Sequence, residues 1–419
     1  MYLRGSKLSM TRRRRRINPL RIAILVLLIG AMVYVNQVIV PATGPLFIPT
    51  PTPTRSPESY VADAQGLVEA GKIPQAIVAY EAAIKVDPRN PSSYIALARL
   101  QIYSGLYAEA ITNADNALLL NANSSIANAL RGWALGFQGE YLEASASLKQ
   151  AIDLDPNNPV PYAYYAEVLA LQQQSDSGGL GTLDEAIEMS QKAEQLGPNT
   201  LEAHRARGLI LEITSNYEEA VAELEAAVSI NPNIADLHIA LGRNYLALEY
   251  YDQAVEQFNN AIPLDPTNPL PKWYLSRTYF RAGEFSKAIL YGEQAIKDNP
   301  TDPYLHGNLG MIYRRAEDLP RAIASLGLAV RGGTTEDGAE VAGLPLDYGR
   351  VAEYYYNYGL ALADNGQCGE ALQIAQALLN GVAADEIAVY NAQEMINICA
   401  AAAGQPTATP AAPEPTPTP

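Results

Sequence analysis

The sequence predicts an all-α solenoid, a row of stacked helix–turn–helix units, because three series of residues recur mostly at intervals of 34 positions, with two longer intervals of 42 and 49. The first series is Ala76, Ala110, Ala144, Ala186, Ala220, Ala254, Ala288, Ala322 and Ala371. A second series of small residues precedes it by 12 positions, at Ala64, Ala98, Gly132, Gly208, Gly242, Ser276, Gly310 and Gly359. The third series is Pro88, Pro156, Pro198, Pro232, Pro266 and Pro300. A fixed period in this range is typical of repeat proteins.

The three series resemble the tetratricopeptide repeat family, whose 34-residue unit has small residues where its two helices touch and a proline at its end. The best single match is Leu241, Gly242, Tyr245, Tyr251, Ala254, Phe258, Ala261 and Pro266. The resemblance covers residues 57–400. It implies a right-handed α-solenoid of about nine helix–turn–helix repeats plus a C-terminal capping helix, with a long concave surface. We assign this solenoid to residues 58–404.

Local chemistry predicts where the helices begin and end. Asp155–Pro159 and Asp265–Pro269 stop one helix and start the next, since Asn caps a helix and Pro suits its first turn. An aromatic residue begins several second helices, as at Tyr217, Tyr251 and Phe285. Residues 385–402 lack the repeat pattern and are expected to form the closing helix that a solenoid needs.

Two insertions interrupt the period. Eight extra residues lie around Gln172–Thr182, in the turn of the fourth unit, and 15 extra residues lie between Ala329 and Gly359. In a solenoid such insertions form surface loops, and they often lie at binding faces. Tolerated drift in length is the alternative.

The beginning of the sequence predicts a membrane anchor. Residues 22–40 form a 19-residue stretch without a charge, and a helix needs roughly 20 such residues to cross a bilayer. Arg12–Arg16 precede the stretch, and no basic residue follows it before Arg55. Because basic residues stay on the cytoplasmic side, we expect residues 1–21 in the cytoplasm and the body outside it, in a bacterial cell envelope. Cleavage near Val40-Pro41-Ala42 is the alternative, but the apolar stretch is longer than a signal-peptide core, which favours an uncleaved anchor.

Two segments rich in Pro and Thr flank the predicted solenoid. Residues 41–57 favour an extended polyproline II linker, which at about 3.1 Å per residue holds the body roughly 50 Å from the membrane. Residues 405–419 repeat this chemistry as a disordered tail. Outside a cell such segments are either glycosylated on Thr or a bare spacer and a bare tail.

The charge distribution excludes nucleic acid as a partner. Eight of the 29 basic residues lie in residues 1–21, which leaves 21 basic against 45 acidic residues in the rest, a net charge of −24. Phosphate attraction needs a basic surface. The arginine block beside a membrane stretch is a topology signal rather than a nuclear-localisation patch.

The two cysteines, Cys368 and Cys399, are too few for a Cys-rich zinc site. Counted from Gly359 as position eight of its unit, Cys368 begins a second helix and Cys399 ends the following first helix. In a helix–turn–helix stack both positions lie along one turn edge, so we expect a disulfide, which an oxidising compartment would keep. Two buried free thiols are the alternative.

The search for catalytic chemistry favours a protein that is not an enzyme and needs no cofactor. His204, His238 and His306 share the fourth position of a first helix, but no Cys or carboxylate cluster joins them, so we expect no metal. The same position holds tyrosine in other units, which indicates a packing role. The glycine-rich segment 178–181 lacks the lysine and the strand of a phosphate-binding loop.

The resemblance implies a binding surface. In tetratricopeptide proteins the first helix of each unit lines the groove, mainly through positions 2, 5, 9, 12 and 13. In repeats six to eight these positions hold Arg243, Trp273, Arg277, Phe280, Arg281, Tyr304, Arg314 and Arg315. Asp236 is the only acid among them. Guanidinium groups suit carboxylates and phosphates, and aromatic residues supply anchoring area, so we expect an acidic or C-terminal peptide segment here.

Two alternatives bear on this surface. The first is that the arginines pair with acids of the body itself, since exposed ion pairs are common and weak. The family also has a carboxylate clamp built on Lys and Asn; Asn308 fits it, but the lysines are absent. The sequence thus predicts a membrane-anchored scaffold that binds a protein or peptide, and a glycan-binding or structural envelope component is the second hypothesis.

Overall fold

A computed structural model describes residues 18–39, 55–175 and 178–404. Contacts divide the chain into two units, residues 1–55 and 56–419, and each is described by itself. The predicted arginine block at 12–16, most of the linker at 41–57 and the tail at 405–419 lie outside the described residues.

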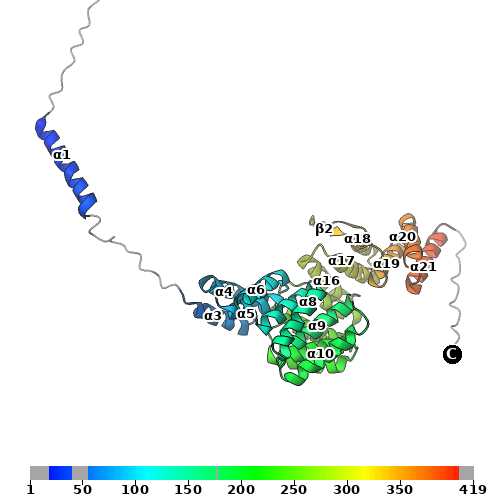
Figure 1. The fold of residues 1–419 in the computed structure, drawn as a ribbon. Helices are drawn as coiled ribbons and strands as arrows, with labels where there is room; N and C mark the ends of the chain where they lie inside the picture. The colour runs from blue at the N-terminus through cyan, green and yellow to red at the C-terminus, as the bar shows by residue number, and fades with distance from the viewer. Residues whose placement is uncertain (1–17, 40–54, 176–177, 405–419) are drawn as a thin grey trace, which may run out of the picture. The chain divides into compact units, whose positions relative to one another are not determined.

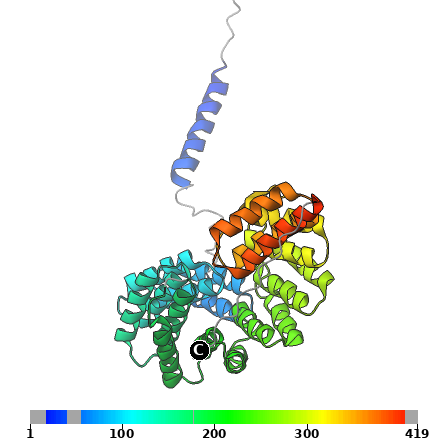
Figure 2. The same cartoon turned by 90° about the vertical axis from the view of Figure 1, so that its right-hand side faces the viewer.

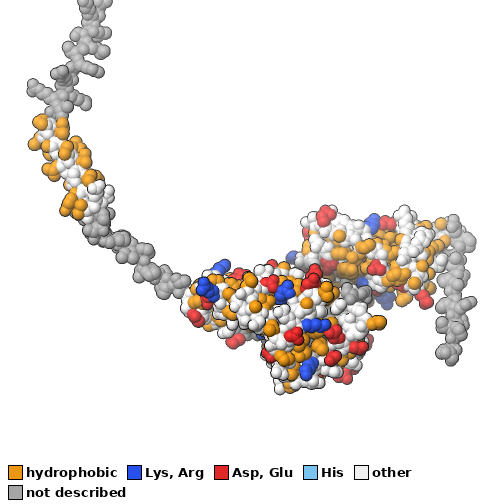
Figure 3. All heavy atoms as spheres, viewed as in Figure 1, with side chains coloured by type: hydrophobic (Ala, Val, Ile, Leu, Met, Phe, Trp, Pro, Cys, Tyr) orange, Lys and Arg blue, Asp and Glu red, His pale blue; other side chains and the backbone are white. Residues whose placement is uncertain are grey.

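The first unit contains one apolar helix. Helix α1 (Pro19–Tyr34) continues as a short π-helix, η1 (Val35–Ile39). Asn18 caps it by accepting a hydrogen bond from the backbone N–H of Leu20. Exposed hydrophobic side chains lie along the face of the helix drawn in Figure 3. Over Pro19–Val38 its mean hydropathy is 2.0, and among the described residues it is the one helix long and apolar enough to cross a membrane. The same properties fit a signal sequence.

The second unit is a row of paired helices, and Figure 1 shows their order. The predicted solenoid of nine helix pairs with a closing helix is confirmed within the described residues. The pairs are α3 (Pro57–Glu69) with α4 (Ile73–Val86), α5 (Pro91–Tyr103) with α6 (Tyr107–Leu120), α7 (Ser125–Phe137) with α8 (Tyr141–Leu154), α9 (Pro159–Gln174) with α10 (Thr182–Leu196), α11 (Leu201–Ile213) with α12 (Tyr217–Ile230), α13 (Ala235–Ala247) with α14 (Tyr251–Ala261), α15 (Leu270–Arg281) with α16 (Phe285–Asp298), α17 (Pro303–Arg315) with α18 (Leu319–Arg331), and α19 (Arg350–Asp364) with α20 (Cys368–Gly381). The closing helix is α21 (Glu386–Ala402).

The predicted start signals lie where the helices begin. Tyr217, Tyr251 and Phe285 are the first residues of α12, α14 and α16. Asn158 caps α9 by accepting a hydrogen bond from the backbone N–H of Val160, with Pro159 as the first helical residue. These local preferences determine where each helix begins.

The turn inside each pair needs one residue in the left-handed region. Glycine supplies it in the earliest turns, at Gly71, Gly105 and Gly139. Ser215 and Glu249 occupy the equivalent place in later turns with φ of 62° and 63°. Non-glycine residues adopt this conformation at a cost of about 1 kcal/mol, so the packing of these pairs holds the strained turns in place.

Small residues at the helix crossing fit a large partner 16 positions later. A Cβ added to Gly242 would lie 2.5 Å from the ring of Phe258, and one added to Gly310 would lie 2.6 Å from Leu326. In the seventh pair the sizes are reversed, since Ser276 faces Gly292 and its hydroxyl donates to the carbonyl of Ala288. The helix crossing therefore limits the combined volume of the two facing side chains rather than the volume of each one.

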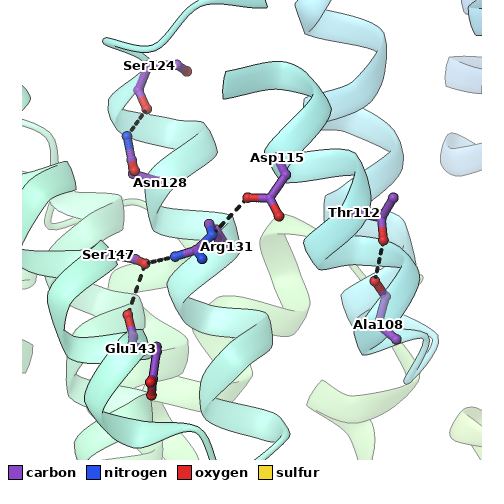
Figure 4. Close-up of polar contacts among 8 residues, drawn as sticks. All are labelled: Ala108, Thr112, Asp115, Ser124, Asn128, Arg131, Glu143 and Ser147. Atoms are coloured by element: carbon purple, nitrogen blue, oxygen red, sulfur yellow. Dashed lines mark hydrogen bonds and ion pairs between the residues drawn. The ribbon is translucent and has the colours of Figure 1, made fainter. Parts of the chain in front are cut away.

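Side chains also join neighbouring pairs. Arg131 of α7 reaches back to Asp115 of α6, with Nε 2.8 Å from Oδ1, and across to the hydroxyl of Ser147 in α8, as Figure 4 shows. The guanidinium thus bridges the second helix of one unit and both helices of the next. Because the ion pair is partly exposed, we assign it orientation rather than a large share of stability.

The first half of the array curves strongly. The side-chain N–H of Asn233, in the turn before α13, donates to the backbone carbonyl of Glu69 at 2.8 Å, although 164 residues separate them. Gly71 lies against the same asparagine and against Leu264. Figure 2 shows the helix pairs following one another around this curve. The first helix pair, α3 with α4, therefore packs against the sixth pair, α13 with α14, as well as against the second.

The two insertions differ in structure. The first lengthens α9 to Gln174 and adds a turn before Thr182, within which residues 176–177 are not described. The second was expected to be a surface loop, but it contains an antiparallel hairpin of β1 (Gly332–Thr334) and β2 (Glu340–Ala342). Val341 of β2 pairs with Gly333 and has a buried side chain, which anchors the hairpin to the body.

The closing helix covers the end of the last pair. Met395 of α21 lies against the position of a Cβ on Gly359, and the structure joins Cys368 to Cys399 in a disulfide with the two Cα atoms 5.5 Å apart. The helix therefore supplies the apolar surface that a next repeat would otherwise provide.

Replacing Gly242 by Ala should lower the free energy of unfolding by about 1–3 kcal/mol, because the new methyl group overpacks against Phe258. Gly66→Ala is the matched control, since nothing lies near that exposed helical position and alanine there should be neutral or stabilising by up to about 1 kcal/mol. Urea unfolding of both variants measures the difference. Equal stabilities would contradict the packing constraint.

Candidate functional site

The concave surface of units three and four is filled by the protein's own side chains. Trp133 of α7 stacks on Tyr164 of α9 with ring centroids 4.1 Å apart. Its indole N–H donates to Glu167 Oε2 at 2.8 Å. All three side chains are buried. Trp133 and Glu167 hold position 9 of their units, one of the positions expected to line an open groove.

A buried arginine extends this cluster. Arg205 of α11 has Nη2 2.6 Å from Asp236 Oδ2 and Nε 3.3 Å from Glu167 Oε1. Its guanidinium also lies 4.9 Å from the ring centroid of Trp133 and 5.7 Å from that of Tyr103. One side chain therefore joins residues from α5, α7, α9 and α13 through ion pairs and cation–π contacts.

Burial dominates the electrostatics of this cluster. It raises the pKa of the Glu167 carboxyl to about 7, although Arg205 and the indole N–H of Trp133 act in the opposite direction. Burial alone would lower the pKa of Arg205, but Glu167 and Asp236 outweigh it and raise that pKa. The cation therefore stays charged, while the carboxyl is able to gain a proton near neutral pH.

The first cavity begins where this cluster ends and has a volume of ≈ 640 Å³. Helices α11, α13 and α15 contribute most of its wall. Its charged lining residues are Glu167, Arg205, Glu212, Asp236, Arg243, Arg277 and Arg281. Its apolar and aromatic lining includes Phe137, Leu171, Leu209, Ile213, Ala240 and Tyr274.

The second cavity, of ≈ 890 Å³, lies between α15, α17 and α19. Its lining includes Trp273, Arg277, Phe280, Arg281, Asn308, Met311, Arg314, Arg315, Glu317, Arg350, Glu353, Tyr356 and Asp364. Arg277 and Arg281 also line the first cavity, so α15 separates the two spaces.

The structure brings seven of the eight predicted binding residues to these cavities. Arg243 lines the first, Arg277 and Arg281 line both, and Trp273, Phe280, Arg314 and Arg315 line the second. Tyr304 lines neither. It is exposed, and its ring packs edge-on against Tyr354.

Two of the five predicted arginines pair with acids of the body. Arg243 forms two hydrogen bonds with Glu212, at 2.9 and 2.8 Å. Arg314 donates to Asn357 at 2.9 Å and has Nη2 3.5 Å from Asp364. These two arginines therefore pair with acids of the body, as the alternative held, because carboxylates of neighbouring units already form ion pairs with them.

The other three arginines have no carboxylate partner within the described residues. Arg281 donates only to the backbone carbonyl of Leu246, and Arg277 and Arg315 form no ion pair there. Burial lowers the pKa of Arg277, and the positive charges of Arg281 and Arg350 lower it further. Glu353 acts in the opposite direction but does not outweigh them. Arg277 and Arg281 of α15 and Arg350 of α19 thus lie close together, and the two on α15 form no ion pair within the described residues, which favours an anionic group from elsewhere.

The histidines have a role that the sequence did not reveal. His238 Nε2 lies 2.8 Å from the carbonyl oxygen of Pro232, and His306 Nε2 lies 2.9 Å from that of Pro300. Tyr162 donates from the same register to the carbonyl of Pro156 at 3.1 Å. The fourth position thus ties a first helix to the proline turn before it. His204 instead lies 2.6 Å from Glu223. Among the described residues no cluster of His, Cys, Asp and Glu is placed to hold a metal ion.

Sequence reasoning also missed the interior cluster of Trp133, Glu167 and Arg205. The signal was present, because a charged pair and a tryptophan occupy groove positions of successive units. Whether such positions face solvent or each other depends on the curvature of the array, which the repeat spacing does not encode.

Comparison with known proteins bears on the fold. A tetratricopeptide repeat profile matches residues 95–159, 178–233, 233–303 and 275–337, which is more than half of the chain. A TPR repeat profile matches residues 65–105. No curated protein matches the chain.

Two solved structures are similar at low identity. Pseudomonas aeruginosa PilF has a TM-score of 0.40 and 20% identity, with 48% of this chain and 88% of that chain covered. A human IFIT1 dimer with PPP-AAAA has a TM-score of 0.46 and 18% identity, with 65% of this chain and 71% of that chain covered. These likenesses concern the fold alone.

Glu167→Gln should flatten the dependence of stability on pH. The folded pKa near 7 lies above the ordinary value of 4.5, so the folded state binds more protons than the unfolded state between these values. The carboxyl's contribution to the free energy of unfolding therefore falls as pH rises through this window, by on the order of 3 kcal/mol, and is constant above it.

Denaturant unfolding of the wild type and Glu167→Gln between about pH 5 and 8 checks this, with the window set by the raised pKa. The exposed Glu188→Gln is the matched control and should keep the wild-type slope. Identical slopes for all three proteins would show that Glu167 titrates as an ordinary carboxyl.

Proposed function

The chain belongs to the tetratricopeptide repeat family, and from that premise we propose that it is a membrane-anchored scaffold outside the cytoplasm that holds an acidic segment of a partner protein. Tetratricopeptide repeats are protein-interaction scaffolds and are generally not catalytic. The proposal concerns the partner's chemistry and the location of the body.

One observation gives the main support for an acidic partner segment. Arg277, Arg281 and Arg315 line the cavities without a carboxylate partner among the described residues, on a body whose net charge is strongly negative. A carboxylate of a bound segment would form charge-assisted, bidentate hydrogen bonds with them. The aromatic rings of Trp273 and Phe280 add apolar area beside these charges.

The Lys/Asn carboxylate clamp does not account for this site. Asn308 lines the second cavity, but it is buried, and its side-chain oxygen accepts a hydrogen bond from the hydroxyl of Tyr354 at 2.8 Å. The cavity contains arginines in place of lysines. We therefore assign recognition to guanidinium groups and to an acidic side chain within a segment.

The aromatic residues also support the second candidate, a glycan-binding component of the cell envelope. Trp273 and Tyr356 both line the second cavity, and such rings stack on the apolar faces of sugars. The unpaired arginines favour the acidic peptide, because a neutral glycan leaves their charge uncompensated.

The membrane location rests on the first unit and on the sequence before it. Helix α1 has the length and hydropathy of a span, and the arginines at 12–16 precede it. Basic residues favour the cytoplasmic side, so the solenoid would lie on the other side, beyond the Pro/Thr-rich linker. A disulfide between Cys368 and Cys399 suits an oxidising compartment.

Changing Arg277, Arg281 and Arg315 together to Ser should weaken binding of acidic peptides at least about tenfold, because three unneutralised guanidinium groups are lost. The measurement applies the detergent-solubilised full-length chain to arrays of acidic, neutral and basic 12-residue peptides and to a glycan array. The wild type should retain acidic peptides, and added salt should weaken that binding.

The matched control changes Lys72, Lys85 and Arg89 to Ser. These exposed residues lie outside both cavities, and the change in net charge is the same. The control should bind as the wild type does. Selective retention of neutral glycans, or acidic peptides that bind the triple variant unchanged, would overturn the acidic-segment proposal.

Protease added to intact spheroplasts should digest residues 58–404 if the body lies outside the cytoplasm, while a cytoplasmic marker protein stays intact. Full protection of the body would overturn the orientation.

The same preparation, denatured without reductant, should show no free thiol. The disulfide should add about 3–4 kcal/mol to the free energy of unfolding on a chain-entropy estimate. Two free thiols would rule out the bond.

A further inference from the structure

Helix α15 presents one continuous strip to both cavities. Trp273, Arg277, Phe280 and Arg281 are spaced by four, three and one positions, so they share one side of the helix. The two arginines of this strip line both cavities. A ligand bound to these two charges is therefore bordered by a cavity on each side.

Part of the wall of the first cavity is apolar, and the acids beside it are already paired. Its acids, Glu167, Glu212 and Asp236, pair with Arg205 and Arg243. What remains besides the strip is an apolar wall of half-buried side chains, including Leu209, Ile213 and Tyr274. Such a space accepts a large apolar side chain rather than a second charge.

The second cavity has a comparable apolar part. Trp273, Phe280, Met311 and Tyr356 are half-buried in its wall. Its acids Glu353 and Asp364 are paired with Arg350 and Arg314, and Glu317 is exposed. A wall of aromatic rings with one flexible methionine accommodates large side chains of varied shape.

We propose that the occupant is a protein segment in which an acidic residue is flanked on both sides by large apolar residues, the acid lying on Arg277 and Arg281 and one flank entering each cavity. The inference rests on the proposed acidic partner and specifies its sequence. Net charge alone does not then define the ligand, because an acidic segment without both flanks leaves one cavity unfilled.

The test is selection of a phage-displayed library of random 12-residue peptides on the detergent-solubilised full-length chain. Enriched sequences should contain Asp or Glu with a large apolar residue on each side. Enrichment of acids without paired flanks would overturn this inference and leave the proposed function intact. Absence of acid enrichment would overturn both.

A synthetic peptide of an enriched sequence then assigns each flank to its cavity. Replacing either flank by Ser should weaken binding about tenfold. Ile213→Ser in the first cavity should weaken binding of the parent peptide by a similar factor. It should not change the affinity of the peptide whose flank for the first cavity is already replaced by Ser. Met311→Ser should behave in the same way for the other flank.

This design separates loss of a contact from loss of the fold. A variant that has merely lost its structure weakens all peptides, whereas the inference requires one flank-deficient peptide to bind the variant as tightly as it binds the wild type. If every peptide loses affinity equally for a variant that keeps its helical circular dichroism, the two-cavity arrangement is wrong.

Discussion

The buried guanidinium of Arg205 constrains the body more than any other single group described above. A charge removed from water needs close partners, since leaving it unpaired costs several kcal/mol. Its partners, Glu167, Asp236 and the ring of Trp133, come from helices of three other units. They meet only if the array curves tightly. The curvature closes the concave surface there and leaves the cavities further along the array.

The local rules of the fold were predictable from sequence because each is satisfied within one unit. The recurring small residue, the aromatic residue that begins the second helix and the capped Asn-Pro turn all act over a few positions. Their spacing, and the family resemblance that it carries, predicted the nine pairs. The loss of that spacing in residues 385–402 predicted the closing helix, which is α21. Contacts within one unit recur in every unit, so the residues that make them recur every 34 positions and can be recognised in the sequence.

The remaining features depend on contacts between units, which periodicity does not contain. Arg243 and Arg277 occupy equivalent groove positions, yet Glu212 neutralises only the first. The hairpin at Gly332–Ala342 was expected to be a loop, because its strands are too short to show an alternating pattern. Sequence therefore indicated which residues line the groove, while the structure separates those available to a ligand from those already paired.

The hydrogen bond from Asn233 to the carbonyl of Glu69 joins two helix pairs that are not neighbours in the array. A simple solenoid is a one-dimensional chain in which each repeat interacts only with its neighbours, so its ends fray independently. Here the first and sixth helix pairs touch, so the six pairs form a closed ring of contacts. Losing the first helix pair removes neighbours of Asn233 and Leu264, which lie far along the sequence. The first six helix pairs are therefore expected to unfold more cooperatively than the pairs of an open array, in which only neighbours touch.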